Sequence, residues 1–264
     1  MALKKKSRVS FGTKTRRDNG GVQVIARAAS ILRVLEPHPE GLSLSQIAAD
    51  VSLPRSTVHR IVSALQAQRF VETTARDGHI RLGSALVVLG NAATRDWRRG
   101  VRPYLEQLFL EVNETVDLAV FEDDHVLFID QIAAPHRLQA VSAVGISFPL
   151  YCSASGKAIL AELTRAEIEL LIPEQLSALT PNTITSRARL LEELESVKAA
   201  HVAYDREEHT IGICAVSAVV RDATGTLAAI SIPVPSIRFY GNEEKLATAL
   251  LNTCSLIRRH FDSM

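Results

Sequence analysis

A tight connection between two amphipathic segments constrains the fold of this chain more than any other sequence feature. Ser43 can cap a short helix that ends near Val51, and Pro54 suits the first turn of a second helix that runs to about Gln68. Only Ser52-Leu53 lies between them. A connection this short forces the two helices to cross at a steep angle, which is typical of a helix-turn-helix.

The segments on either side extend this motif. Apolar residues at helical spacing predict a helix over residues 22–35, and two short strands are predicted at 70–74 and 79–82. Between the strands, Asp77-Gly78 is a strong hairpin signal. Three helices followed by a hairpin are the pattern of a winged helix-turn-helix, a DNA-binding fold, which we expect over residues 21–83.

The second helix of the motif carries the predicted DNA-reading face. At about 100° per residue, the side opposite its apolar stripe presents short hydrogen-bonding groups and an arginine, which can read base edges in the major groove. The alternative is a solvent-exposed polar helix face without a DNA-binding role. The helix-turn-helix spacing and the basic hairpin together argue against this alternative. The residues predicted to contact DNA are Arg55, Ser56, Thr57, His59 and Arg60 on the helix, and Arg76 and Arg81 in the hairpin.

Charge is distributed unevenly along the chain. Residues 1–100 hold 17 Lys and Arg against 7 Asp and Glu, whereas residues 101–264 hold 13 against 22. A basic first part suits a polyanionic partner such as DNA, with uneven surface decoration as the alternative. Residues 1–20 are basic and almost without apolar side chains, so we expect a mobile arm there. The arm either touches DNA phosphates or is a solvated tail.

A further helix is predicted between the hairpin and the rest of the chain. Ser84 can cap an apolar segment that runs toward Trp97, and Gly100 and Pro103 are expected to end it and to act as a hinge. We therefore expect a linker helix over residues 84–100, with an apolar stripe that pairs with a partner chain. The second domain is expected to span residues 101–264.

The second domain mixes strands and helices. Alternating or continuous apolar runs predict about six strands, with helices before, between and after them, which is an α+β arrangement. The strands are expected at 115–122, 126–131, 138–144, 202–206, 213–220 and 226–232, and the helices at 104–112, 156–163, 165–171, 187–200 and 242–260.

Several separated motifs resemble those of the IclR-type bacterial transcriptional regulators. They are Leu53-Pro54-Arg55-Ser56-Thr57-Val58-His59-Arg60, Ser153-Ala154-Ser155-Gly156-Lys157-Ala158, and the segment from Tyr204-Asp205-Arg206-Glu207-Glu208 through Ala215-Val216-Ser217 to Asp222. The resemblance covers nearly everything after the arm. It implies a winged helix-turn-helix, a linker helix and a GAF-like effector-binding domain with an antiparallel sheet. The chain departs from the family pattern at His201 and Val219.

The resemblance also implies a small-molecule site in the second domain, with a carboxylic acid as the expected ligand class. Carried over by position, its contacts are Ala154 and Ser155 through their backbone, together with Asp205, Ala215 and Ser231. Ala215 stands where one member has a thiol, and Pro233 where it has a serine. The resemblance therefore implies a less polar pocket and a larger or more apolar ligand.

These residues can also be interpreted without the family. Ser153, Ser155 and Gly156 form a small-residue turn before an apolar helix, which either binds an anion such as a carboxylate or is an ordinary N-cap. Asp205 either faces a ligand or belongs to a solvated acidic patch. Ser217, like Ser231, either faces a pocket or bonds neighbouring backbone.

Other classes of function have little support in the sequence. Cys152 or Cys214 could be paired on paper with His201 or His209, as in a hydrolase, but no nucleophile elbow, phosphate loop or His-Glu-x-x-His motif is present. No cysteine and histidine pair has zinc-ligand spacing, so we expect no metal and no other cofactor. No apolar run approaches the ~20 residues of a membrane span, and a cytoplasmic location is the expectation.

The sequence therefore predicts a two-domain DNA-binding regulator, either repressor or activator, and not an enzyme. Its winged helix-turn-helix would bind a double-stranded operator under the control of a small metabolite held by the second domain. Two-fold DNA sites favour a homodimer, and the family resemblance adds a homotetramer as an alternative. A DNA-binding protein that responds to no ligand is the remaining alternative.

Overall fold

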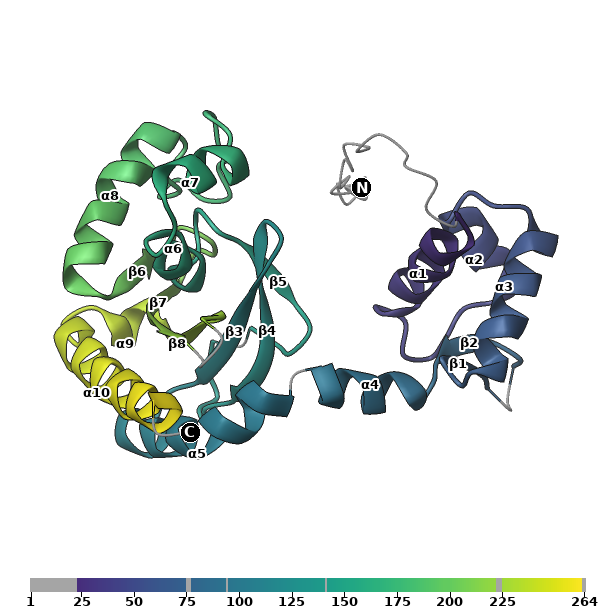
Figure 1. Cartoon of the computed structure of the whole chain (residues 1–264), viewed down its shortest axis with the longest axis horizontal. Coiled ribbons are helices and arrows are strands. Elements are labelled where there is room, and N and C mark those ends of the chain that lie inside the picture. Colours follow the sequence, from purple (N-terminus) through teal and green to yellow (C-terminus); the bar gives the residue numbers. More distant parts are fainter. Residues whose placement is uncertain (1–22, 75–76, 94, 141, 222–224, 263–264) are drawn as a thin grey trace, which may run out of the picture. The chain divides into compact units, whose positions relative to one another are not determined.

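Residues 23–74, 77–93, 95–140, 142–221 and 225–262 are described by a computed structural model, in which the chain divides into two units after Ala93 (Figure 1). The first unit contains three helices, a hairpin and a fourth helix within its described residues, in the predicted order. They are α1 (Gln23–Leu35), α2 (Leu44–Asp50), α3 (Arg55–Ala67), β1 (Val71–Thr73), β2 (Ile80–Leu82) and α4 (Ala85–Ala93). The predicted basic arm lies outside the described residues.

One apolar core holds the first unit together. The predicted inward faces of its three first helices meet the hairpin there, and the core includes Ile31, Ile47, Val58, Val62 and Ile80. Helix α2 begins with a capping box. Gln46 donates its backbone N–H to the Ser43 hydroxyl, and Ser43 donates its own N–H to the Gln46 side chain. The predicted helix-turn-helix and hairpin are confirmed.

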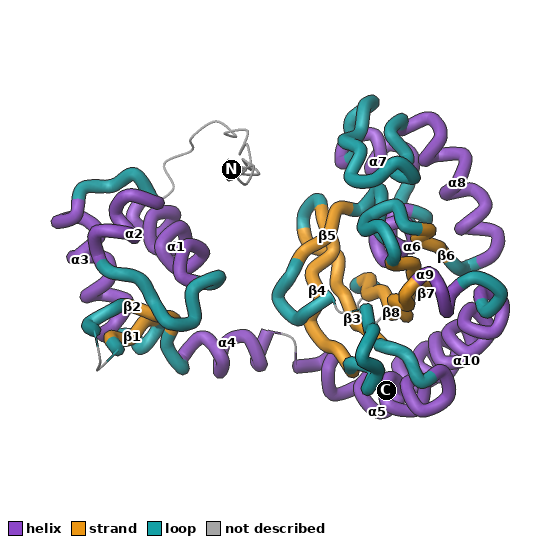
Figure 2. The backbone as a smooth tube through the Cα atoms, turned by 180° about the vertical axis from the view of Figure 1, so that it is seen from behind, coloured by secondary structure: helices purple, strands orange, loops and turns teal. Residues whose placement is uncertain are grey.

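The second unit is built on one antiparallel sheet in the order β5-β4-β3-β8-β7-β6. Figure 2 shows this sheet with helices on both of its faces. The strands are β3 (Val116–Glu122), β4 (His125–Ile132), β5 (Ser147–Pro149), β6 (Ala203–Arg206), β7 (Ile213–Arg221) and β8 (Leu227–Pro235). The helices are α5 (Arg95–Val112), α6 (Ala154–Leu160), α7 (Arg165–Leu171), α8 (Arg187–Ala200), α9 (Ser236–Phe239) and α10 (Glu243–Asp262). The predicted α+β class is confirmed.

Alternation along the strands gives the sheet two apolar faces. Along β7, Cys214 and Val216 pack in the core beneath α5 and α10, whereas Ala215 and Ser217 point to the opposite face. Helix α6 covers part of that opposite face and packs against β7 and β8. The face turned away from α5 and α10 is thus the one on which small and polar residues gather.

The predicted break near Gly100 and Pro103 is wrong. Helix α4 ends at Ala93, and α5 runs without interruption from Arg95 to Val112, with Pro103 inside it. Proline removes one helical hydrogen bond and disfavours a helix interior. Here tertiary packing outweighs that preference, because Val101 and Leu105 on either side are fully buried and α5 lies along α10.

One predicted strand is also wrong. Residues 138–140 and 142–144 lie outside any strand, and the edge strand β5 follows at Ser147–Pro149. The apolar side chains that suggested a strand are instead exposed, Leu138 at 58% and Val144 at 55%. Helix α6 begins two residues earlier than predicted, at Ala154, and β8 continues three residues further, to Pro235.

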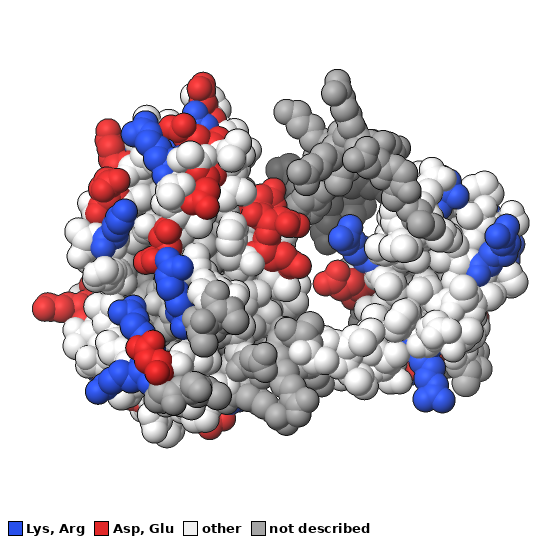
Figure 3. Space-filling model, in the orientation of Figure 1, with Lys and Arg blue, Asp and Glu red and all other residues white. Residues whose placement is uncertain are grey.

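Charged side chains of both signs intermingle over the second unit on the face drawn in Figure 3. Within the part of the chain that the structure describes, no helix has the length and apolar character needed to cross a membrane.

Candidate functional site

Helix α3 presents the polar face that the sequence predicts. Val58, Ile61 and Val62 point into the core, while Arg55, Ser56, His59 and Arg60 are exposed. Leu53 and Pro54 lead into the helix, and Pro54 is its N-cap residue. The α2–α3 connection is as tight as expected, because the Leu53 N–H donates to the Ala48 carbonyl.

The predicted DNA-contacting residues do not all share one stripe of α3. Thr57, which is half-buried, and Arg60 line a groove between α3 and α1, together with Arg27. Ser56 and His59 lie on the neighbouring stripe, away from that groove. The exposed face therefore runs from His59 through Ser56 to Arg60, whose side chain also lines the groove toward α1.

The hairpin supplies less free positive charge than predicted. Arg81 lies opposite Glu72 in the β1–β2 register and forms an ion pair with it, with Nη2 at 2.7 Å from Oε1. Its positive charge is therefore already balanced across the strand. Arg76, the other predicted wing residue, lies outside the described residues.

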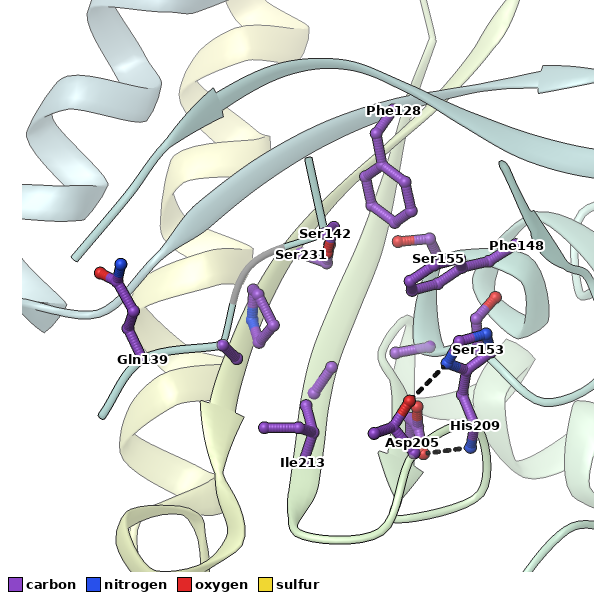
Figure 4. A pocket seen from close by; sticks show the side chains of 15 residues that line it. Phe128, Gln139, Ser142, Phe148, Ser153, Ser155, Asp205, His209, Ile213 and Ser231 are labelled. Carbon is purple, nitrogen blue, oxygen red and sulfur yellow. Dashed lines mark hydrogen bonds between the residues drawn. The ribbon is translucent and has the colours of Figure 1, made fainter. Parts of the chain in front are cut away.

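The second unit contains a pocket of about 340 Å³ on the sheet face turned away from α5 and α10. In the view of Figure 4, Asp205 and His209 lie on one side, Gln139 on the other, and Ser142 and Ser231 between them. Fifteen residues line it: Phe128, Gln139, Ala140, Ser142, Phe148, Ser153, Ala154, Ser155, Asp205, His209, Thr210, Ile213, Ala215, Ser231 and Pro233.

The structure brings together five of the six residues predicted to contact an effector, namely Ala154, Ser155, Asp205, Ala215 and Ser231. Ser217 is the exception. Its side chain is fully buried, donates to the Ile230 carbonyl at 2.9 Å and lies 3.4 Å from the Ser155 hydroxyl. Ser217 lies on the pocket face of the sheet, but α6 covers that part of β7. Ser217 therefore contacts Ser155 beneath α6 and does not reach the pocket.

A close backbone approach fixes the turn at the start of α6. A Cβ on Gly156 would lie 2.3 Å from the Leu150 carbonyl oxygen, so only glycine lets the two segments meet. Ser153 is the N-cap, and its hydroxyl accepts the Gly156 N–H at 3.1 Å. Ser153, Ala154 and Ser155 are thereby held against the pocket.

Asp205 is the acidic group of the pocket. It is 6% exposed and accepts the Glu208 N–H at 2.7 Å and the His209 N–H at 3.4 Å. Burial raises the pKa of Asp205 to about 7, and the negative charge of Glu208 adds to that rise. Near neutral pH this carboxyl therefore exchanges between a hydrogen-bond donor and an acceptor.

A buried lysine lies behind Asp205. Lys157 of α6 is fully buried and pairs with Glu193 of α8 and with Glu208, at 2.5 Å from its Oε1. Among the residues that the structure describes, Glu208 Oε2 is buried without a hydrogen-bond partner, and burial raises the pKa of Glu208. This cluster ties α6 and α8 to the turn that follows β6, the strand that carries Asp205.

An aromatic wall closes the pocket beside His209 and Ser155 (Figure 4), and the sequence interpretation missed it. The Phe148 ring stacks on His209 at a centroid distance of 3.9 Å and meets Phe128 edge-on at 5.0 Å. Burial lowers the pKa of His209. Phe128 and Phe148 pack against the apolar cluster that includes α6, and both rings also line the pocket.

The groups proposed for catalysis are poorly suited to it. Burial raises the pKa of the Cys152 thiol to about 12 and that of Cys214 to about 11, so neither forms a thiolate readily near neutral pH. Over the described residues, no group of three or more His, Cys, Asp or Glu side chains is placed to hold a metal ion.

Comparison with known proteins agrees with this architecture. Residues 24–75 match the IclR helix-turn-helix domain, and residues 91–258 match the C-terminal domain of the bacterial transcriptional regulator IclR. The chain belongs to the IclR family of transcriptional regulators. As members of this family are, it is a DNA-binding regulator of transcription.

Relatives match over nearly their whole length. The HTH-type transcriptional regulator Rv1719 of Mycobacterium tuberculosis is 47% identical over 92% of this chain and 94% of its own length. The HTH-type transcriptional regulator TtgV of Pseudomonas putida is 40% identical over 91% of this chain and 92% of its own. An IclR regulator of Alicyclobacillus acidocaldarius has a similar structure, with a TM-score of 0.81 and 25% identity over 91% of this chain and 99% of its own.

A second solved structure is an IclR homologue of Microbacterium hydrocarbonoxydans in complex with 4-hydroxybenzoate. It superposes with a TM-score of 0.83 at 24% identity, over 91% of this chain and 100% of its own. At this identity the likeness concerns the fold.

Proposed function

We propose that this regulator binds an operator through α3 and the hairpin, and that a small organic molecule in the pocket of the second unit controls that binding. The observation that carries the proposal is the pocket itself. It combines a buried carboxyl group, serine hydroxyls and an aromatic wall in a volume that suits a small metabolite. A DNA-binding protein without a ligand would have no use for such a set of groups.

The ligand we propose is a small acid with a flat ring. Phe148 and Phe128 offer ring faces and edges for stacking, and Ser155 and Ser231 offer hydroxyl groups. The pocket lining contains no Lys or Arg among its fifteen residues. A ligand carboxylate would accept from these serine hydroxyl groups, and Asp205 would add a hydrogen bond only in its protonated form. The 4-hydroxybenzoate complex of the Microbacterium homologue makes that compound a suitable first probe.

Thermal-shift titrations at pH 6 and pH 8 test this proposal. Because the pKa of Asp205 is about 7, benzoate-type acids should raise Tm more at pH 6 than at pH 8. Neutral phenols, which donate to an ionised carboxylate, should show the opposite order. Asp205→Asn should remove the pH dependence of either series. Equal shifts at both pH values would contradict the assigned role of Asp205, and no shift with any small acid or phenol would contradict a ligand site.

The operator complex is proposed to contain a homodimer. Helix α4 exposes Val87, Val88 and Leu89 at 64%, 69% and 52%, and an apolar surface of this kind is suited to burial against a second copy. A two-fold operator matches a two-fold dimer. Sedimentation of wild type and of Val88→Glu tests the idea. The charged variant should shift the protein toward monomer, and an unchanged mass would place the dimer contact elsewhere.

A further inference from the structure

A chain of hydrogen bonds crosses the sheet of the second unit, from the pocket to α5. It starts at Ser142 in the pocket lining, whose hydroxyl donates to Asp117 Oδ2 at 2.6 Å. Asp117 Oδ1 accepts from Gln131 Nε2 at 2.7 Å. The Gln131 backbone N–H donates to Asp130 Oδ1 at 2.9 Å, and the same oxygen accepts from Arg102 Nη1 of α5 at 2.7 Å.

A β-bulge makes this crossing possible. Asp117 pairs with Gln131 and Leu118 with Asp130, but Ala119 pairs with Phe128, so the register shifts by one residue at Ile129. In a regular strand Phe128 and Asp130 would share a face. The bulge instead turns Asp130 toward the α5 side, while Gln131 and Asp117 stay on the pocket side. The hydrogen bonds on the pocket side and those on the α5 side therefore meet at Gln131. Its side chain bonds Asp117, and its backbone N–H bonds Asp130.

Burial makes the links of this chain depend on one another. Asp117 is fully buried, Asp130 is 3% exposed and Ser142 is 7% exposed. A buried polar group that loses its partner destabilises the folded protein, because water cannot replace the lost hydrogen bond. A movement of Ser142 therefore changes the hydrogen bonds of Asp117 and Gln131. Because the Gln131 N–H donates to Asp130, the change also affects the carboxylate that binds Arg102.

The far end of the chain lies on the helix that follows α4. Arg102 also donates to Glu106 one turn further along α5, at 3.0 Å. Helix α5 starts at Arg95, two residues after α4 ends. A change in the Arg102–Asp130 ion pair therefore acts near the start of the second unit. This is where the polypeptide enters from the DNA-binding unit.

We propose that Asp117 and Gln131 are positioning residues that couple the pocket, through Ser142 and across the bulge, to Asp130 of β4 and its partner Arg102 on α5. The signalling role of this coupling rests on the proposed function, whereas the mechanical coupling does not. A ligand that displaces Ser142 changes the hydrogen bonds of Asp117, and α5 responds. In this proposal α5 has two arrangements, one with the Arg102–Asp130 ion pair formed and one with it broken.

Amide hydrogen exchange of the full-length protein without ligand tests the coupling directly. Ser142→Ala should speed exchange of the α5 amides around Arg102 by about fivefold or more, although α5 lies on the opposite face of the sheet. Thr210→Ala is the matched control, because Thr210 lines the same pocket. Ser142→Thr retains the hydroxyl group and should restore the wild-type rate.

A second background tests whether the effect passes through the proposed residues. In Gln131→Met the amide link to Asp117 is absent, so adding Ser142→Ala should change α5 exchange no further. Arg102→Met removes the donor to Asp130 at the other end of the hydrogen-bond network and serves as an independent background if Gln131→Met does not fold. The effect of Ser142→Ala should vanish there as well.

Three results would overturn the inference. They are an unchanged α5 in Ser142→Ala, an effect of equal size with and without Gln131, and an equal acceleration in α10, which would mean general loosening of the core. Each concerns exchange without ligand, so each is separate from a failure of the ligand titrations that test the proposed function.

Discussion

At the residue scale, the pocket combines a buried carboxyl group and serine hydroxyls with an aromatic wall. Asp205 and Ser231 were identified by resemblance, and the structure places both in the pocket lining. Ser217 was misplaced because strand alternation gives the face of a residue but not what covers it. Phe148 was missed because its strand, β5, was not predicted, and Phe128 because an apolar residue in a strand looks the same in sequence whether it faces a core or a cavity.

The buried carboxyl group of Asp205 predicts a pH dependence of stability. Its pKa is about 7 in the folded protein and close to the ordinary 3.8 when unfolded, so the folded state binds the extra proton between these values. Stability should therefore fall as pH rises from about 4 to about 7. Asp205→Asn keeps the acceptor oxygen and removes the charge, and should reduce that fall by on the order of 2–4 kcal/mol.

Urea unfolding at pH 5 and pH 8 measures this effect. Trp97 is the single tryptophan, and it is buried against Phe261 in the second unit, so its fluorescence reports the relevant unfolding. Asp124→Asn, in the exposed turn between β3 and β4, is the control and should leave the pH dependence intact. An Asp205→Asn variant with the same pH dependence as wild type would mean that Asp205 is ionised throughout.

At the element scale, local signals predicted most helices and failed where packing overruled them. The bounds of α7 and α8 match the prediction because each has a polar N-cap, Thr164 and Ser186. Pro103 was interpreted as a helix end, yet α5 continues through it because its apolar stripe packs against α10. The bulge at Ile129 left no sequence signal, since it depends on pairing with β3.

The continuity of α5 gives a direct prediction for Pro103. Its side chain is exposed, so replacing it removes little packing, and an alanine restores the missing backbone N–H. Pro103→Ala should raise the free energy of unfolding of the second unit by about 1–3 kcal/mol. Urea unfolding followed by Trp97 fluorescence checks it. A lower stability would indicate that the proline stabilises α5, which would contradict this prediction.

The exposed face of α3 predicts where operator sequence is read. His59→Ala and Arg60→Ala should each weaken operator binding by about 1–3 kcal/mol and weaken binding to unrelated DNA much less. Arg33→Ala, an exposed charge on α1, is the control and should affect both DNAs alike. Fluorescence anisotropy with both DNAs gives the comparison. Equal losses on both DNAs would limit α3 to phosphate contacts.

At the scale of the whole molecule, function depends on two units that the sequence already distinguished by charge and by pattern. The helix-turn-helix was predictable because tight turns and caps are local signals. The pocket was harder to predict, because β4, β6, β7, β8 and α6 meet there from distant parts of the sequence. We propose that the first unit binds DNA and the second binds the ligand. Regulation then requires that ligand binding changes the free energy of DNA binding.

Reciprocal titration measures that coupling most directly. The ligand found by thermal shift is titrated into the protein with and without operator DNA, and operator DNA is titrated with and without the ligand. Our account predicts that ligand changes the operator Kd by about 5–150-fold, and that operator changes the ligand Kd by the same factor. A ligand that fills the pocket and leaves operator affinity unchanged would contradict the account.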